Sequence, residues 1–219
     1  MSPTSLNSLY LQLKKTVQKW QRIQVTTTSA SLKLFSIVNR WVNLQSINSL
    51  DPLAPFEDLS PRLTAKILQE IGNHIPKLQA SLPESEQLVI NMTKLRHQWL
   101  LWLTKKHKEA TPKQRLILED MISNIEKIFP MFVSEIELKR VICQQLSQIS
   151  SPKDCTLYLT VWISEPYLDY NLLEECLENL KQGQKRYLDV KFEEETREDS
   201  GDEKLNQPSS VQLQSQDQR

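Results

Sequence analysis

The chain has 219 residues with 27 basic and 27 acidic side chains, so no overall field draws it towards DNA or RNA. Three glycines are too few for phosphate-binding loops, dinucleotide-binding turns or tight hairpins, which need positive φ. We find no signal-peptide pattern and no apolar run of about 20 residues, and therefore expect an all-α protein without a membrane span.

The first predicted helical region covers residues 5–48. Apolar side chains recur there at steps of three and four residues, which is the spacing of one helical face. The β-branched stretch Val25–Thr28 interrupts this stripe. The pattern leaves two alternatives open, one bent helix or a helical hairpin.

A proline-containing connector, residues 51–61, precedes the second region. Ser60 followed by Pro61 predicts a helix start there, because a hydroxyl can cap free N–H groups and proline suits the first helical position. Pro76 lies inside the apolar stripe that follows. It removes a backbone donor, so we expect it to kink or divide this helix.

Three further helical regions complete the pattern. A stripe over Leu88–Trp102 predicts the first of them. Thr111–Pro112 and Ser151–Pro152 repeat the capping hydroxyl and proline, and predict two more helix starts. The helix after Thr111 is expected to bend near Pro130, and the last stripe covers residues 172–180. Such stripes, joined by short connectors, predict an antiparallel helical bundle with coiled-coil character.

Two domains are expected, a helical bundle over residues 1–182 and a disordered acidic tail over 183–219. Residues 191–219 are rich in Glu, Asp, Gln and Ser and have almost nothing to bury, so they cannot offset the entropy of ordering. Truncation after Gly183 is therefore expected to leave thermal stability almost unchanged. Ser200, before Gly-Asp-Glu, resembles a substrate of acidophilic kinases.

No catalytic, cofactor or metal site is expected. The three histidines and three cysteines show no zinc-ligand spacing, and reduced thiols fit best. These residues are His74, His97, His107, Cys143, Cys155 and Cys176. The sequence has no nucleophile-elbow motif. The basic cluster Lys105–Lys108, with Lys113 and Arg115, is interpreted as a solvated helix end, with an acidic partner or a phosphate as the alternative.

The distinctive segment lies late in the chain, where a tryptophan, a proline and a tyrosine fall within six residues. Trp162 follows an apolar helical run, so we expect it mainly in the core. Tyr167 follows the corner at Pro166, so we expect it nearer a contact surface, together with the charged pair Lys139 and Arg140. These five residues are the candidates for partner binding.

The steps Leu138–Arg140, Thr156–Leu157, Trp162–Ile163 and Pro166–Asp169 resemble the cyclin-dependent kinase 2-interacting protein (CINP) family. Fainter similarity covers Lys19-Trp20, Thr26–Ala30 and Leu78–Leu95. Pro76 and Pro83 depart from the more even coiled coil of that family.

The resemblance implies a non-enzymatic adaptor of the nucleus, with the cytoplasm as a second location. Implied partners are cyclin-dependent kinase 2, the Dbf4-dependent kinase, the ATR-interacting protein and the subunits of an AAA+ ATPase assembly. That assembly acts on replisome proteins and in maturation of the large ribosomal subunit. No direct specific binding of nucleic acid is expected. The alternatives are a structural coiled-coil tethering protein and a metal-binding helical-bundle enzyme.

Overall fold

A computed structural model describes residues 6–48, 58–146, 148 and 151–202, and all structural statements concern this part of the chain. These residues form helices and no strands, which confirms the all-α fold. The helices are α1 (Leu6–Asn48), α2 (Leu59–Gln79), α3 (Leu82–Glu109), α4 (Pro112–Leu146), α5 (Pro152–Ser164) and α6 (Tyr170–Asp202).

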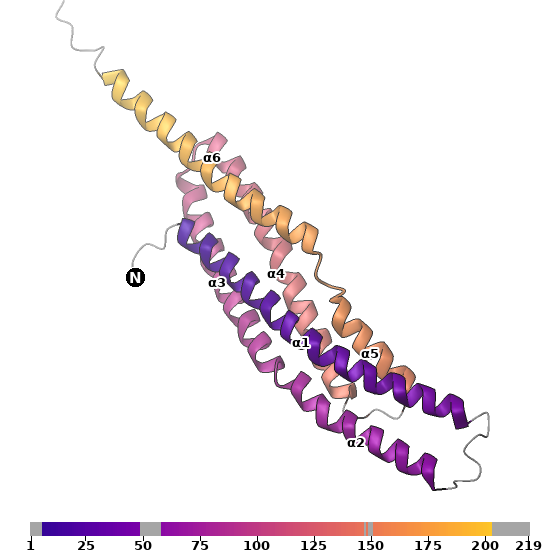
Figure 1. Cartoon of the computed structure of the whole chain (residues 1–219). Coiled ribbons are helices and arrows are strands. Elements are labelled where there is room, and N and C mark those ends of the chain that lie inside the picture. Colours follow the sequence, from indigo (N-terminus) through magenta and orange to yellow (C-terminus); the bar gives the residue numbers. More distant parts are fainter. Residues whose placement is uncertain (1–5, 49–57, 147, 149–150, 203–219) are drawn as a thin grey trace, which may run out of the picture.

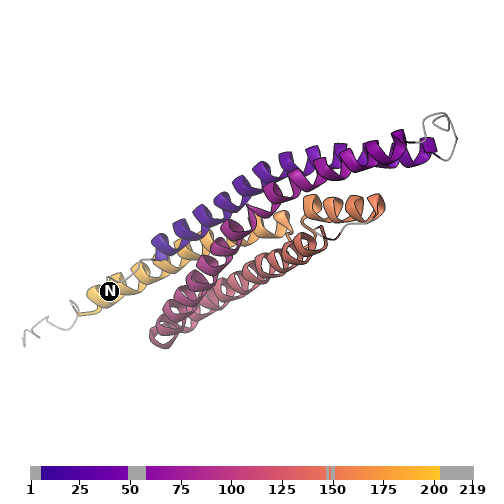
Figure 2. The ribbon, with the colours of Figure 1, turned by 90° about the horizontal axis from the view of Figure 1, so that it is seen from below.

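The helices are arranged as four rods in an up-down-up-down bundle (Figure 1). Helix α1 is the first rod, α2 and α3 together form the second, α4 is the third, and α5 and α6 form the fourth. Helices α1 and α4 each pack against the second and fourth rods and lie diagonally across from each other. Figure 2 shows the far ends of α1 and α2 side by side, extending past α5.

The capping signals predict two helix starts correctly. Helix α4 begins at Pro112, where Gln114 N–H donates to Thr111 Oγ1 (3.4 Å) and Thr111 N–H donates to Gln114 Oε1 (3.3 Å). This reciprocal pair is a capping box. Helix α5 begins at Pro152, and Ser151 Oγ accepts a hydrogen bond from Lys153 N–H (3.2 Å).

The start predicted at Pro61 is wrong, because α2 begins at Leu59. Asp58 occupies the cap position without a capping side-chain bond, and proline is tolerated in the first turn, where its missing N–H has no partner to lose. The choice at residues 5–48 is settled as one continuous helix. Helix α1 runs through the β-branched stretch from Leu6 to Asn48, and Ser31 Oγ donates to the carbonyl of Thr27 (2.9 Å).

Of the two proline effects expected, the division of the second rod near Pro76 is observed, and the bend of α4 near Pro130 stays a prediction. Helix α2 passes through Pro76 and ends at Gln79, and Ala80 and Ser81 keep right-handed helical dihedral angles before α3 begins. The chain is therefore divided four residues after Pro76, between it and Pro83. Helix α4 runs through the exposed Pro130 without interruption.

The predicted boundary after residue 182 is wrong. Helix α6 continues to Asp202, and Tyr187 and Val190 are buried in the core. The ring of Tyr187 meets that of Trp102 edge-on, with centroids 6.0 Å apart. The stripe was missed because its last apolar members are widely spaced among charged residues. Residues 203–219, the remainder of the expected tail, lie outside the described part of the chain.

The bundle has two apolar clusters, one at each end. The first cluster joins the N-terminal half of α1 to α3, α4 and α6, and the second joins its C-terminal half to α2, α5 and the end of α4. Between them the buried positions of α1 hold Gln24, Thr27 and Ser31. We call this level, at residues 20–31 of α1, the central layer.

Candidate functional site

A buried set of charged and polar side chains, the polar node, fills the middle of the central layer. It consists of Gln24 and Trp20 from α1, Glu135 and Lys139 from α4, Trp162 from α5, Glu165 after α5, and Tyr170 from α6. Three of the four rods therefore contribute to one network.

Lys139 is the centre of the polar node. Its side chain is 1% exposed and crosses the diagonal of the bundle, where Nζ donates to Gln24 Oε1 (2.5 Å) and to Glu165 Oε1 (2.8 Å). The ammonium also lies 5.4 Å and 5.0 Å from the ring centroids of Trp20 and Trp162. A buried ammonium needs this degree of compensation, because leaving water costs several kcal/mol.

Glu165 connects the node to the corner between α5 and α6. Its backbone is left-handed, with φ of 44°, and it ends α5. Its carboxylate accepts from Lys139, from Trp20 Nε1–H (3.3 Å) and from the hydroxyl of Tyr170. A non-glycine residue at positive φ is strained, and the three bonds hold it there.

Glu135 gives the node a second carboxylate against one cation. Its Oε2 accepts from the backbone N–H of Tyr167 (3.3 Å), and its Oε1 lies 3.6 Å from Lys139 Nζ. Burial raises the pKa of Glu135, and the pull of Lys139 in the opposite direction does not cancel that effect.

Of the five partner-binding candidates, two are buried in this node. Trp162 is 2% exposed, which confirms that it belongs mainly to the core. The expectation that Lys139 lies near a contact surface is wrong, because it falls on the face of α4 that points into the bundle. Neither side chain is accessible to a partner in this fold.

The other three candidates are exposed. Pro166 and Tyr167 form the corner between α5 and α6, and the side chain of Tyr167 is 52% exposed. Arg140 turns instead towards α3, where its Nε lies 2.6 Å from Glu86 Oε1. Their role in partner binding stays a prediction.

Sequence reasoning missed most of the node, although a signal for it was present. Glu135 and Lys139 follow Phe132 at steps of three and four residues, so they share the buried face of α4. Gln24 likewise continues the apolar stripe of α1. A polar side chain at a core position of such a stripe predicts that it has a buried partner. Which residue of another helix is that partner can be known only from the fold.

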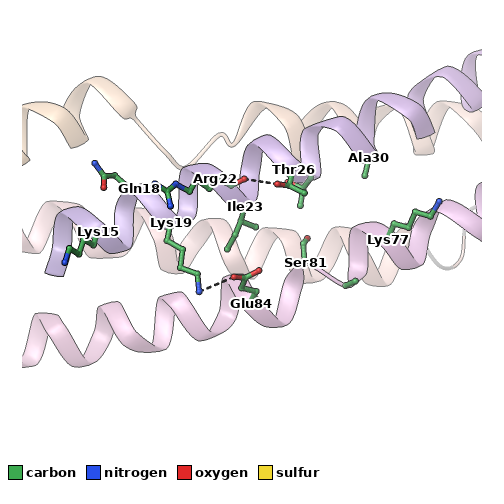
Figure 3. Close-up of a pocket in the computed structure, with 12 residues that line it drawn as sticks. Lys15, Gln18, Lys19, Arg22, Ile23, Thr26, Ala30, Lys77, Ser81 and Glu84 are labelled. Carbon is green, nitrogen blue, oxygen red and sulfur yellow. Dashed lines mark hydrogen bonds and ion pairs between the residues drawn. The ribbon is translucent and has the colours of Figure 1, made fainter. Parts of the chain in front are cut away.

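A surface groove flanks the same layer, between α1 and the joint of α2 and α3. It has a volume of about 970 Å³. Figure 3 shows Lys15, Lys19 and Arg22 along α1, and Lys77, Ser81 and Glu84 on the second rod, with Lys19 reaching across to Glu84. We call it the basic groove. Its remaining lining residues are Gln18, Ile23, Thr26, Thr27, Ala30 and Ala80.

The other sequence candidates are packed or paired locally. The three cysteines are buried and form no disulfide among the described residues, and burial raises the pKa of Cys143 to about 11 and that of Cys155 to about 12. Near the predicted basic cluster, Lys106 pairs with Glu109 and His107 with Glu119.

Within the described ranges no three His, Cys, Asp or Glu residues are grouped as a metal site would require. None of the helices described there has both the length and the apolar character needed to cross a bilayer.

The fold and these surfaces define an all-α bundle with a buried, hydrogen-bonded polar centre and an open basic groove. Residues 3–177 match the family described as ribosome biogenesis protein C1orf109-like, and the chain belongs to that family. The membership supports a role in ribosome biogenesis. It differs from the CINP family suggested by residues 138–169, which the comparison does not confirm. No curated protein matches the chain.

Proposed function

We propose that this chain is a non-enzymatic adaptor in a protein assembly that matures the large ribosomal subunit. The observation that carries the proposal is family membership over residues 3–177, which places the chain among ribosome biogenesis proteins. A helical bundle is suited to this role, because it presents helix faces to larger partners.

The proposal includes an AAA+ ATPase as the partner that supplies the energy of the assembly. This step rests on the resemblance of residues 138–169 to an AAA+-associated family, which also suggests action in both nucleus and cytoplasm. The replication kinases and checkpoint factors implied by that resemblance have no further support. We therefore place ribosome maturation first.

Affinity purification of the full-length, tagged chain from cell extract tests the proposal. Co-purification of an AAA+ ATPase with precursors of the large ribosomal subunit is the expected result. Recovery of replication kinases without ribosomal precursors would transfer the adaptor role to DNA replication, and recovery of cytoskeletal proteins alone would contradict both. Metal analysis of the purified chain tests the enzyme alternative, which stoichiometric zinc or iron would favour.

A further inference from the structure

The basic groove has the dimensions of a helix-binding site. It runs along α1 from Lys15 to Ala30, a length of roughly 22 Å or four helical turns. The wall opposite is formed by one face of the second rod, from Lys77 to Glu84. A fifth helix of about 15 residues laid between these walls would contact both rods at once.

The groove is open because its floor is made of small side chains. Helix α1 presents Thr26, Thr27 and Ala30 there, and the joint of the second rod presents Ala80 and Ser81. Two helices whose facing residues are this small cannot fill the space between their outer edges. Ile23 and the two alanines leave an apolar strip along the base, which suits the apolar face of an incoming helix.

The rim of the groove is positively charged. Lys15, Arg22 and Lys77 have exposed side chains and no ion pair within the described residues. The fourth cation, Lys19, reaches across the groove to Glu84, with Nζ and Oε1 3.1 Å apart. Both side chains of this pair are more than half exposed, so water screens the pair and little is lost when it breaks. The bridge does not close the site.

We propose that the basic groove binds an acidic amphipathic helix of a partner protein. Apolar residues of that helix would cover the strip at Ile23, Ala30 and Ala80, and its carboxylates would pair with Lys15, Arg22 and Lys77. The inference rests on the proposed adaptor function and names the surface and the partner chemistry that the adaptor would use.

The composition of the groove favours a protein helix over RNA. Proteins that hold single-stranded RNA interleave basic residues with aromatic rings on which bases stack. No aromatic side chain lines the basic groove. An apolar floor with a charged rim is the arrangement that grooves for amphipathic helices share.

The test is a titration of the full-length chain into a fluorescent model peptide, followed by anisotropy. The peptide carries leucine on one helical face and glutamate on the other, and a matched peptide has lysine in place of glutamate. We expect saturable binding of the glutamate peptide that weakens with salt, and at least about tenfold weaker binding of the lysine peptide. No saturable binding at low salt, or equal binding of both peptides, would overturn the proposal.

Two pairs of variants separate charge from shape. Lys15→Glu, Arg22→Glu and Lys77→Glu together should weaken peptide binding at least about tenfold, whereas Lys33→Glu, Lys66→Glu and Lys94→Glu, with the same charge change outside the groove, should not. Ala30→Trp should block the groove, whereas Ser29→Trp on the neighbouring exposed position should not. Circular dichroism confirms folding of each variant. Equal effects within either pair would contradict a site in this groove.

Two further measurements address other occupants. Polyuridine RNA that binds more tightly than the peptide, with the same loss in the triple groove variant, would overturn the proposal in favour of RNA. A wild-type dimer that the groove variant converts to a monomer in sedimentation would assign the groove to a second copy. Co-purification with the AAA+ ATPase tests the adaptor function separately: if the groove variant loses the peptide but keeps the assembly, the adaptor role stands and the groove is not its docking surface.

Discussion

The two faces of α1 in the central layer use charge in opposite ways. On the inner face, Trp20 and Gln24 bind the network around Lys139, which is shielded from water on all sides. On the outer face, Lys19 and Arg22 stand in solvent along the basic groove. The comparison shows that burial decides what a lysine does. A buried ammonium must be matched by fixed acceptors and so determines the fold, whereas an exposed one is available to a partner.

Replacing Lys139 with methionine should produce the largest difference between the two faces. The change leaves Glu135 and Glu165 buried with no cation beside them among the described residues, which we expect to cost about 3–5 kcal/mol of folding free energy. Urea unfolding measures the loss. Arg140→Met, at the next position on α4, removes an exposed pair and should cost less than about 1 kcal/mol. A small effect of Lys139→Met would mean that the node does not hold the bundle.

The distinctive segment late in the chain also combines a buried side chain, Trp162, with an exposed one, Tyr167. Trp162→Ala removes a buried ring that covers the Lys139 ammonium, and should cost about 3–5 kcal/mol. Tyr167→Ala removes a half-exposed ring and should change stability by less than about 0.5 kcal/mol. Melting temperature and recovery of partners are measured for both variants. If Tyr167→Ala unfolds the chain while Trp162→Ala only releases a partner, the two roles are the reverse of those assigned.

Shortening the chain within α6 compares a buried stretch of this helix with the exposed stretch that follows it. Ending the chain after Gly183 removes Tyr187 and Val190 from the core, so we expect a loss of about 2–4 kcal/mol. Ending it after Thr196 keeps both residues and should be nearly neutral. Thermal unfolding of the two truncated chains provides the measurement, and equal melting temperatures would show that the buried turn adds nothing.

The polar node holds two carboxylates and one ammonium, so we expect the folding free energy to depend on pH. The pKa of Glu135 is higher in the folded than in the unfolded chain, so its contribution to stability is complete below the unfolded pKa and is lost as pH rises through the folded value. Glu135→Gln mimics the protonated form and should remove this loss. The variant should therefore gain stability relative to wild type as pH is raised, in urea titrations that start below the ordinary glutamate pKa of 4.5 and continue upward. A difference that is constant with pH would contradict the raised pKa.

The smallest effect on folding is expected in the basic groove. Arg22→Glu reverses an exposed charge that has no ion pair within the described residues, and should change folding free energy by no more than about 0.5 kcal/mol. Differential scanning calorimetry at low and high salt measures it. A loss above about 1 kcal/mol would show that the groove serves the fold, and the contrast between the two faces of α1 would disappear.

Local signals in the sequence predicted what depends on neighbouring residues. Thr111 before Pro112, and Ser151 before Pro152, predicted helix starts because a cap needs only one turn of chain. The polar node could not be predicted in this way. Lys139 meets Gln24 across 115 residues of sequence and Glu165 across 26, and periodicity identifies the buried face of each helix but not the face it meets.

Surface features were predictable only in part. Tyr167 was expected outside because a proline corner precedes it, and the structure agrees. Lys15, Lys19 and Arg22 share one face of α1 by their spacing, but the opposite wall with Lys77 lies 62 positions from Lys15, so the sequence did not predict the groove. Such a surface exists only after the rods are packed.

Because α1 runs through both apolar clusters, the packing of the bundle cannot be completed until the last helix has been synthesised. Trp20 leaves the ribosome 145 residues ahead of Glu165, its hydrogen-bond partner. At a synthesis rate of about 5–20 residues per second, this interval lasts roughly 7–30 s. Throughout it, the earliest helix carries an apolar stripe whose last covering helix has not yet been made. Until the final helix emerges, the apolar stripe of α1 therefore stays open to chaperones and to non-native contacts.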